Sequence, residues 1–387
     1  MPSPQHLHLP HKSYNSFFVA IPQLANNYFK DIFSLFFTFA LMEKDQLYMQ
    51  RCIELAQLGI RSVYPNPLVG AVIVHNDKII GEGYHKSYGE AHAEVNAVNS
   101  VSDKSLLNKA TIYVSLEPCA HFGKTPPCAD LLVKHQFKKV VIGCKDTFSE
   151  VSGKGIDRLR KHGIEVKVGI LEEKCRNLNK RFFTFHEKKR PYIILKWAET
   201  VDGFMDKKRN SSTPEINWIT QPETQTLVHK WRSEEHAILV GTNTALNDNP
   251  SLTVRNVTGQ NPIRILIDRN LKIKPEAEIY NTESKTIILN SKKKYENGNL
   301  KFIQLEDFSI KSITNTLYEE KIQSIIIEGG SETIQRFIDE KLWDEARVLI
   351  GQSSFKEGLK APSLSFRPLG QTDFYGDTIY RYKNFNN

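Results

Sequence analysis

The chain has few cysteines and no dense basic stretch. Its five cysteines, an odd number in 387 residues, are too sparse for the disulfide framework of a small secreted domain, and they favour a reducing cytoplasm. A formal charge of +8 is spread over 52 basic and 44 acidic side chains. No Lys/Arg run is interleaved with aromatic residues, so we interpret this charge as a solvated surface rather than a nucleic-acid interface.

The sequence also lacks a membrane-spanning run. The apolar segment from Ile32 to Met42 is shorter than the roughly 20 residues that cross a bilayer. It has neither the basic start nor the small-residue cleavage site of a signal peptide, which leaves export as the weaker interpretation. An amphipathic helical pattern then begins at Met42, and globular domains often start with such a helix. We therefore predict that Met42 is the true start and that residues 1–41 are a non-native or disordered extension.

The length exceeds that of a usual single core and predicts two domains. In the first half, β-rich segments alternate with helical patterns, which predicts a mixed sheet covered by helices, with a hairpin turning at Asn76 and Asp77. A helical pattern over 172–191, with a basic end and a proline, predicts one helix that closes this domain near Lys188. The second half again has an α/β pattern, and the halves share no repeat. The expected strands lie in 68–75, 111–117, 138–144, 164–170, 191–198, 236–241, 262–268, 285–290 and 323–330.

Four residues of the first half form a constellation that suits a catalytic zinc ion. His92 begins a helical pattern, and Cys119 and Cys128 follow a predicted strand. One imidazole and two thiolates leave the fourth tetrahedral position open for water, as in catalytic zinc sites. Glu94, two residues from His92, does not share its helical face, and we predict that it shuttles the proton. Pro118 suits a helix-opening position, from which first-turn N–H groups would favour the Cys119 thiolate.

Two alternatives remain open for these residues. Buried cysteines and a capping histidine can occur together without any metal, as we expect for Cys52, Cys144 and Cys175. A zinc ion can also serve folding alone, without catalysis. Such a structural site would normally fill its fourth position and would not need Glu94.

The order of these motifs resembles the cytidine deaminase superfamily, in which the cysteines are usually two residues apart. Here eight residues, AHFGKTPP, separate them. This expanded form, together with PNPLVG at 65–70 and GYHKSYGEAHAE at 83–94, is similar to the deaminase half of the bifunctional riboflavin-biosynthesis deaminase and reductase family. The resemblance covers nearly all of residues 42–387 and implies that Asn66, His121 and Lys124 contact a phosphorylated aminopyrimidine. Asn66, between two prolines, is alternatively only a turn residue.

The second half contains a strand followed by two glycines and a helix start, in the sequence IIIEGGSETIQRF at 325–337. Exposed N–H groups in such a turn can bind phosphate, and Gly329 and Gly330 allow close backbone approach. The turn is not the GxGxxG fingerprint, and a glycine pair after a strand is often just a connection. Four other segments accompany it, namely KWAETVDGFMD, NWIT, HAILVGTNTALNDNPSLTVR and PIRILID.

Together these five segments are similar to the reductase half of the same family. The resemblance implies an α/β chain, with a cytidine-deaminase-like α/β/α domain over 42–187 and a dihydrofolate-reductase-like domain over 188–387, and it implies Zn²⁺ and NADPH as cofactors. It places NADPH at Ala198, Trp218, Thr244, Asp248, Gly330, Ser331, Glu332, Thr333, Ile334, Gln335 and Arg336. It places substrate at Arg232, Leu252, Arg255 and Glu328.

Some positions of the second half stay undecided. Arg232 and Arg255 suit phosphate clamps, although any arginine can be a surface charge. Lys196 and Asp202 are alternative proton donors for the reduction. Ile216 stands where the family pattern commonly has a small polar residue, which puts a substrate contact there in doubt.

We predict two consecutive reactions, hydrolytic loss of the pyrimidine amine and then NADPH reduction of the ribosyl chain, in a cytoplasmic homo-oligomer that binds neither nucleic acid nor membrane. A nucleic-acid deaminase with an accessory domain is the nearest rival, since it would use the same zinc chemistry on a flipped base. The eight-residue cysteine spacing and the missing basic stripe argue against it. A chain that keeps only one activity is the other alternative.

Overall fold

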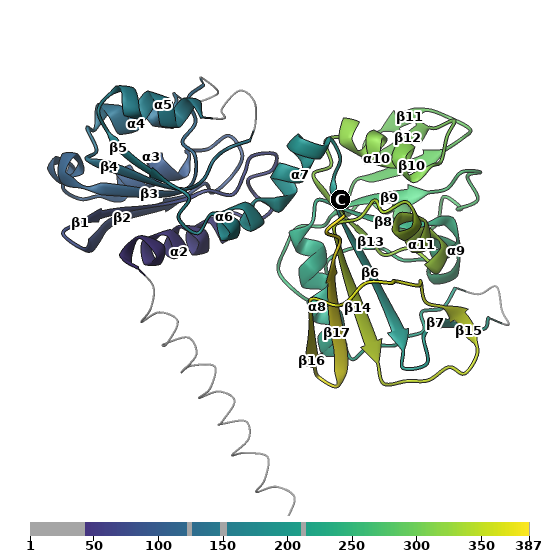
Figure 1. Cartoon of the computed structure of the whole chain (residues 1–387). Helices are drawn as coiled ribbons and strands as arrows, with labels where there is room; N and C mark the ends of the chain where they lie inside the picture. The colour runs from purple at the N-terminus through teal and green to yellow at the C-terminus, as the bar shows by residue number, and fades with distance from the viewer. Residues whose placement is uncertain (1–42, 122–125, 148–152, 210–213, 387) are drawn as a thin grey trace, which may run out of the picture.

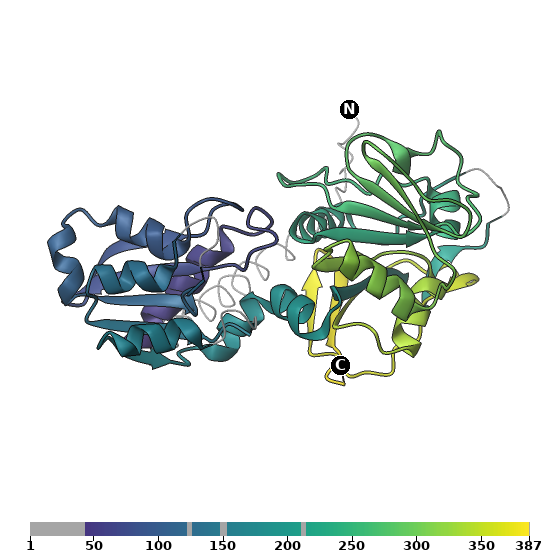
Figure 2. The ribbon, with the colours of Figure 1, turned by 90° about the horizontal axis from the view of Figure 1, so that it is seen from above.

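A computed structural model describes residues 43–121, 126–147, 153–209 and 214–386. The predictions for residues 1–41 and for Lys124 lie outside these described residues. Figure 1 shows two sheet-containing units side by side along the chain. Seen from above in Figure 2, the units remain separate and are joined where the first one ends.

The first unit is a mixed sheet with helices on both faces. Within the described residues its strand order is β2-β1-β3-β4-β5. Strands β1 and β2 form an antiparallel hairpin, β3 pairs antiparallel with β1, and β3, β4 and β5 run parallel. The elements are α2 (Lys44–Gln57), β1 (Gly70–His75), β2 (Lys78–Tyr84), α3 (Ala93–Ser100), β3 (Thr111–Leu116), α4 (Cys128–Lys134), β4 (Lys139–Cys144), α5 (Lys154–Lys161), β5 (Glu165–Val168), α6 (Glu172–Leu178) and α7 (Lys180–Lys188).

Alternating side chains of this sheet feed two apolar clusters. Ile73, Ile112 and Ile142 pack towards α3, α4 and α5, whereas Val72 and Val141 pack towards α2 and α6. Both faces are therefore buried, which explains why the strands are almost wholly apolar. The four predicted strands and the mixed sheet are confirmed, and so is the hairpin.

That hairpin turns on two residues with left-handed backbone. Asn76 and Asp77 have φ angles of 48° and 60°, between the paired residues His75 and Lys78. Asn and Asp tolerate this conformation better than other non-glycine residues do, which is why these two residues predicted the turn.

The prediction of one helix over 172–191 is wrong, because two helices occupy this segment. Asn179 separates α6 from α7 with a φ angle of −103°. Its buried side chain accepts a hydrogen bond from the Leu68 N–H and donates one to the Leu68 carbonyl, both at 2.8 Å. The break is thus set by a loop 111 residues earlier in the chain, which a local helical pattern does not reveal.

The second unit is a larger sheet with a parallel centre. Its order within the described residues is β11-β12-β10-β9-β8-β13-β6-β14-β17-β16, parallel from β12 to β14 and antiparallel at both ends. A separate two-stranded sheet joins β7 to β15. The elements are β6 (Tyr192–Thr200), β7 (Phe204–Lys207), α8 (Pro222–Glu234), β8 (Ala237–Gly241), α9 (Thr242–Asp248), β9 (Ile263–Ile267), β10 (Thr286–Asn290), β11 (Tyr295–Asn297), β12 (Leu300–Gln304), α10 (Ile310–Glu319), β13 (Ser324–Ile327), α11 (Ser331–Asp339), β14 (Glu345–Gly351), β15 (Gly358–Lys360), β16 (Gly370–Phe374) and β17 (Asp377–Lys383).

Helices cover this sheet on both faces as well. The largest cluster joins β6, β8 and β13 to α10 and α11, with the fully buried Phe337 and Trp343 among its members. On the opposite face Val228 and Trp231 of α8 pack on Ile194 and Ile326. All five strands predicted for the second half are confirmed. Among the described residues, no helix has the length and apolarity needed to traverse a lipid bilayer.

Candidate active sites

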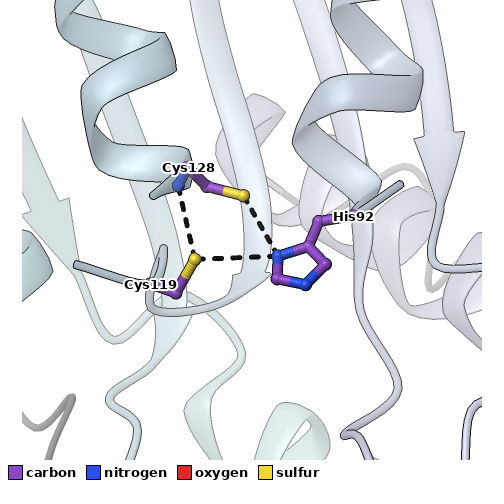
Figure 3. Close-up of side chains that lie close together, drawn as sticks. All are labelled: His92, Cys119 and Cys128. Atoms are coloured by element: carbon purple, nitrogen blue, oxygen red, sulfur yellow. Dashed lines mark hydrogen bonds between the residues drawn. The ribbon is translucent and has the colours of Figure 1, made fainter. Parts of the chain in front are cut away.

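The predicted histidine and both cysteines meet at the end of the first sheet. The His92 Nδ1 atom lies 3.2 Å from Cys128 Sγ and 3.6 Å from Cys119 Sγ, and all three donor atoms lie within 4.8 Å of one another. Figure 3 shows the three side chains turned towards a common point. Zinc bond lengths place tetrahedral N and S ligands roughly 3.3–3.8 Å apart, so this cluster fits one zinc ion with a further position open.

The structure corrects one prediction about this cluster, the helix start at Cys119. Cys119 does not open a helix, because α4 begins at Cys128 with Pro127 as its N-cap residue. The Cys128 backbone N–H nevertheless donates to Cys119 Sγ at 3.3 Å. The helix start therefore supports the Cys119 thiolate from across the loop, not from Cys119's own backbone.

Hydrogen bonding within the cluster favours an ionised thiol. Donation from the Cys128 thiol lowers the pKa of Cys119 to about 4, with His92 and the Cys128 N–H acting in the same direction. A thiolate is the form that binds a metal cation. The chemistry of the donor set thus agrees with its geometry.

Glu94 lies beside the cluster in the first turn of α3, as predicted, and only 3% of its surface is exposed. Burial, and then the neighbouring Cys119, raise the pKa of Glu94 to about 6. A carboxyl group whose pKa is this close to neutral can both accept and return a proton. Glu94 and His92 line a cavity of about 380 Å³, which is within the size range of small-molecule sites.

The same cavity brings together two of the predicted substrate contacts. Asn66 and His121 both line it. They come from loops that follow α2 and β3, so their approach is produced by the fold. Their contact with substrate stays a prediction.

His85 was not singled out from the sequence, although it lies in the GYHKSYGEAHAE motif. It is 3% exposed, and its Nδ1 lies 3.1 Å from the Ala91 carbonyl, so Nδ1 carries the proton. Its Nε2 then accepts from Asn66 Nδ2 at 3.0 Å. This orientation leaves the Asn66 Oδ1 atom as an acceptor for an N–H group of a ligand.

Glu117, also missed, organises the wall of the cavity. Its buried carboxylate accepts backbone N–H groups of Asp146, Gly153, Gly155 and Ile156 at 3.0–3.3 Å. It thereby ties the end of β3 to the start of α5. The partners of Glu117 lie about 30 to 40 residues later in the chain, so the sequence around Glu117 does not predict this role.

A second cavity, of about 400 Å³, lies in the second unit near the carboxyl ends of β6, β8 and β13. Ligands of open parallel sheets usually bind outside these strand ends. Eight predicted residues line it, namely Ala198, Trp218, Thr244, Asp248, Arg232, Leu252, Arg255 and Glu328. They come from segments spread over 131 positions of the sequence, from residue 198 to residue 328.

A buried ionic triad forms one wall of this cavity. Arg232 Nε and Nη2 donate to the two carboxylate oxygens of Glu328 at 3.0 and 2.7 Å, and Lys196 Nζ lies 3.7 Å from Glu328. Burial alone would raise the pKa of Glu328, but the two cations outweigh it and lower that pKa to about 2. The pair with Glu328 uses the Nε and Nη2 donors of Arg232. A guanidinium has five N–H donors, so this pair does not exclude a phosphate contact, and that role of Arg232 stays a prediction.

Arg255 is the other arginine that we predicted to bind a phosphate. It is exposed at the cavity rim, and its Nη1 donates to Ser251 Oγ at 2.6 Å and to Thr253 Oγ1 at 3.4 Å. No described carboxylate pairs with it. A phosphate group could therefore recruit its remaining donors.

The structure also separates the two proton-donor candidates. Lys196 lines the cavity, and burial lowers its pKa, which eases proton release. Asp202 does not line the cavity, and its carboxylate accepts from Thr200, Ser354 and two backbone N–H groups. Those hydrogen bonds lower its pKa, so Asp202 acts as a loop anchor.

The glycine turn lies next to the cavity. Residues 330–336 do not line it, but the Gly330 N–H donates to Thr244 Oγ1 at 2.7 Å. A Cβ atom at Gly329 would lie 2.7 Å from the Gly241 nitrogen, so only glycine fits between β13 and β8. Ile216 does line the cavity and is 43% exposed there.

A cytidine-deaminase-like unit with a metal-binding cluster, joined to a second α/β unit with its own polar cavity, defines a two-site enzyme. Family models agree with both units. The model for the cytidine and deoxycytidylate deaminase zinc-binding region matches residues 42–144, and that for the RibD C-terminal domain matches residues 191–352.

Relatives extend this agreement over most of the chain. The riboflavin biosynthesis protein RibD of Aquifex aeolicus is 40% identical over 86% of this chain and 94% of its own length. A solved Thermotoga maritima deaminase and 5-amino-6-(5-phosphoribosylamino)uracil reductase matches with a TM-score of 0.80 and 36% identity, over 88% of this chain and 99% of that one. Acinetobacter baumannii RibD matches with a TM-score of 0.79 and 33% identity, over 87% and 98%. The chain belongs to the RibD family of bifunctional riboflavin-biosynthesis proteins, with a deaminase domain followed by a reductase domain.

Proposed function

We propose that the chain removes an amine from 2,5-diamino-6-(5-phosphoribosylamino)pyrimidin-4(3H)-one in its first cavity and reduces the resulting aminouracil with NADPH in its second. The observation that carries the proposal is the His92, Cys119 and Cys128 cluster beside buried Glu94 in a cavity of about 380 Å³. The substrate follows from the deaminase and reductase activities for which the Thermotoga maritima relative is named.

In the first cavity, His92, Cys119 and Cys128 would hold one zinc ion, which supplies a water molecule activated near neutral pH. Glu94 takes a proton from that water and delivers it to the departing amine. Its pKa of about 6 suits both halves of this transfer. Asn66, oriented by His85, accepts a hydrogen bond from an N–H of the pyrimidine. His121 and Lys124 complete the substrate contacts.

In the second cavity, Ala198, Trp218, Thr244 and Asp248 would hold NADPH together with the neighbouring 330–336 turn. The helix start at Ser331 offers N–H groups suited to phosphate. When bound, NADPH would supply the hydride, and Lys196 would supply the proton to the opening ribose. Glu328 fixes Arg232 and Lys196 at the substrate, next to Leu252, and Arg255 contacts the ribose phosphate.

The proposal also covers the domain boundaries, the cellular compartment and the binding partners. The deaminase domain spans 42–187 and the reductase domain 188–387, preceded by an extension over 1–41. All five cysteines are free in the structure, which suits a reducing cytoplasm. We expect a homo-oligomer that binds small phosphorylated substrates and neither nucleic acid nor membrane.

Two assays on purified protein test the proposal half by half. Zinc-loaded protein should release ammonia from the diaminopyrimidine phosphate without any nicotinamide. The deaminated intermediate, supplied separately, should oxidise NADPH faster than NADH. Ammonia release from a cytosine-containing oligonucleotide, with none from the diaminopyrimidine, would instead favour a nucleic-acid deaminase.

A further inference from the structure

The loop that carries Asn66 into the first cavity is held from two sides. On one side, the Leu68 backbone makes the paired hydrogen bonds with Asn179 of the same domain. On the other side, the Pro65 carbonyl accepts a hydrogen bond of 2.7 Å from Gln323 Nε2, 258 residues later in the chain. The loop of the deaminase site is thus fastened to the reductase domain.

Gln323 is a firm anchor for this contact. It is 2% exposed and directly precedes β13 in the core of the second sheet. Its carbonyl accepts the Tyr192 N–H at 2.9 Å, and its own N–H donates to His236 Nδ1 at 3.3 Å. Its main chain is therefore fixed on both sides, so only the amide side chain reaches the loop.

A second contact holds the loop in the same place. The Tyr64 ring stacks on the His236 ring, with centroids 4.9 Å apart and planes 22° apart. The Tyr64 hydroxyl lies 3.1 Å from Ser324 Oγ, which also accepts the His236 N–H at 3.0 Å. Residues before and after Pro65 are thus positioned by the two domains together.

We propose that Gln323 is a positioning residue for deamination, acting across the domain boundary through Pro65 on Asn66. It does not touch substrate, because it lines neither the first nor the second cavity. The inference rests on the proposed deamination. It means that the reductase domain supplies part of the support for the deaminase substrate site.

The expected effect is on substrate binding. Replacing Gln323 with leucine keeps the volume and leaves the Pro65 carbonyl without its donor. Loss of one buried partner corresponds to roughly 5- to 100-fold in an equilibrium. We expect kcat/KM for ammonia release to fall about tenfold, mainly through a higher KM. Reduction of supplied intermediate should stay within about twofold of wild type, since the Gln323 side chain is remote from that cavity.

Lys180→Met provides the matched control. It removes another contact between the domains, the 2.8 Å ion pair with Glu345, without touching residues 64–67. It should leave KM for deamination unchanged. A double-mutant cycle then separates positioning from general destabilisation. In the Asn66→Ala background, Gln323→Leu should cost little more, because the residue on which it acts is already gone.

Hydrogen exchange of segment 62–69 gives a readout that needs no substrate. The Asn66 N–H bonds to the Val63 carbonyl at 2.8 Å, and the Leu68 N–H to Asn179. These amides should exchange faster in Gln323→Leu than in wild type or Lys180→Met. Gln323→Met, which keeps the length of the side chain but lacks the donor, repeats the test if the leucine variant does not fold.

The inference is overturned if Gln323→Leu leaves both KM and exchange unchanged, if its effect adds fully to that of Asn66→Ala, or if both activities fall together. A wild-type protein that releases no ammonia defeats the proposed function instead. Faster exchange of segment 62–69 in the variant would still support the positioning contact in that case.

Discussion

The two domains differ in how closely their site residues lie together in the sequence. In the deaminase domain, the three cluster residues and Glu94 lie within 37 consecutive positions, and the donor atoms of the three cluster residues lie within 4.8 Å of one another. In the reductase domain, the eight predicted residues that line the cavity are spread over 131 positions, and the glycine turn lies beside the cavity. In the proposed function, side chains and the metal ion that they would hold carry out deamination, whereas a bound cofactor would carry out most of the reduction. Only the first reaction would then require a compact set of reactive residues.

Removal of the metal should produce the largest difference between the two domains, because deamination should be lost while reduction is kept. Cys128→Ser deletes one of three donors, and we expect zinc content to fall from about one per chain to near zero, with no measurable ammonia release. NADPH oxidation with supplied intermediate should persist. Cys144→Ala, a buried cysteine outside the cluster, is the control and should keep its zinc. Zinc measured by mass spectrometry together with both assays decides the outcome, and equal loss of both activities would contradict independent sites.

Glu94→Gln should stop proton transfer while leaving the metal in place. We expect kcat for ammonia release to fall about 10²- to 10⁴-fold, since a positioned acid–base group contributes that much. Glu173→Gln, an exposed glutamate of α6, should have no effect. Retained zinc with retained deamination would show that another group carries the proton.

Glu328→Gln tests the ionic triad that forms one wall of the reductase cavity. It leaves Arg232 and Lys196 buried without a counter-charge, which costs about 3 kcal/mol or more of folding free energy in comparable buried pairs. We expect NADPH oxidation to fall about 100-fold and deamination to survive at temperatures where the protein stays folded. Glu320→Gln, which breaks a more exposed pair with Lys301, should cost less than about 1 kcal/mol. Denaturant unfolding and steady-state rates measure both effects.

Trp218→Ala should have the smallest effect. Trp218 lines the reductase cavity but is 58% exposed, so we expect its proposed contact with NADPH to contribute about 1 kcal/mol. Its loss should raise KM for NADPH about fivefold. Tyr375→Ala removes a similarly exposed aromatic outside the cavity and should change nothing. A KM that does not respond to Trp218→Ala would remove this residue from the cofactor site.

What the sequence predicted well was local. Strand periodicity, the Asn76–Asp77 turn and the order of His92, Cys119 and Cys128 each depend on neighbouring residues, and each agrees with the structure. The errors arose where the cause lies far along the chain. Asn179 breaks the predicted helix because it bonds to Leu68, 111 residues earlier. The pair of Arg232 with Glu328, 96 residues away, was likewise not foreseen.

The same physical reason explains what was missed. His85 is oriented by its tautomer, which the Ala91 carbonyl fixes. Glu117 accepts four backbone N–H groups that lie beyond β3 in the chain. The Gln323 contact joins residues 258 positions apart. Folding alone creates such partners, so residue type and spacing do not predict them.

The central claim, two consecutive reactions at two sites of one chain, is tested most directly by following ammonia and NADPH together. Purified protein is given the diaminopyrimidine phosphate and NADPH in one vessel. The account predicts that ammonia appears first and that NADPH oxidation follows after a lag, until the two amounts are equal. NADPH oxidation without ammonia, or ammonia without any subsequent NADPH oxidation, would contradict it.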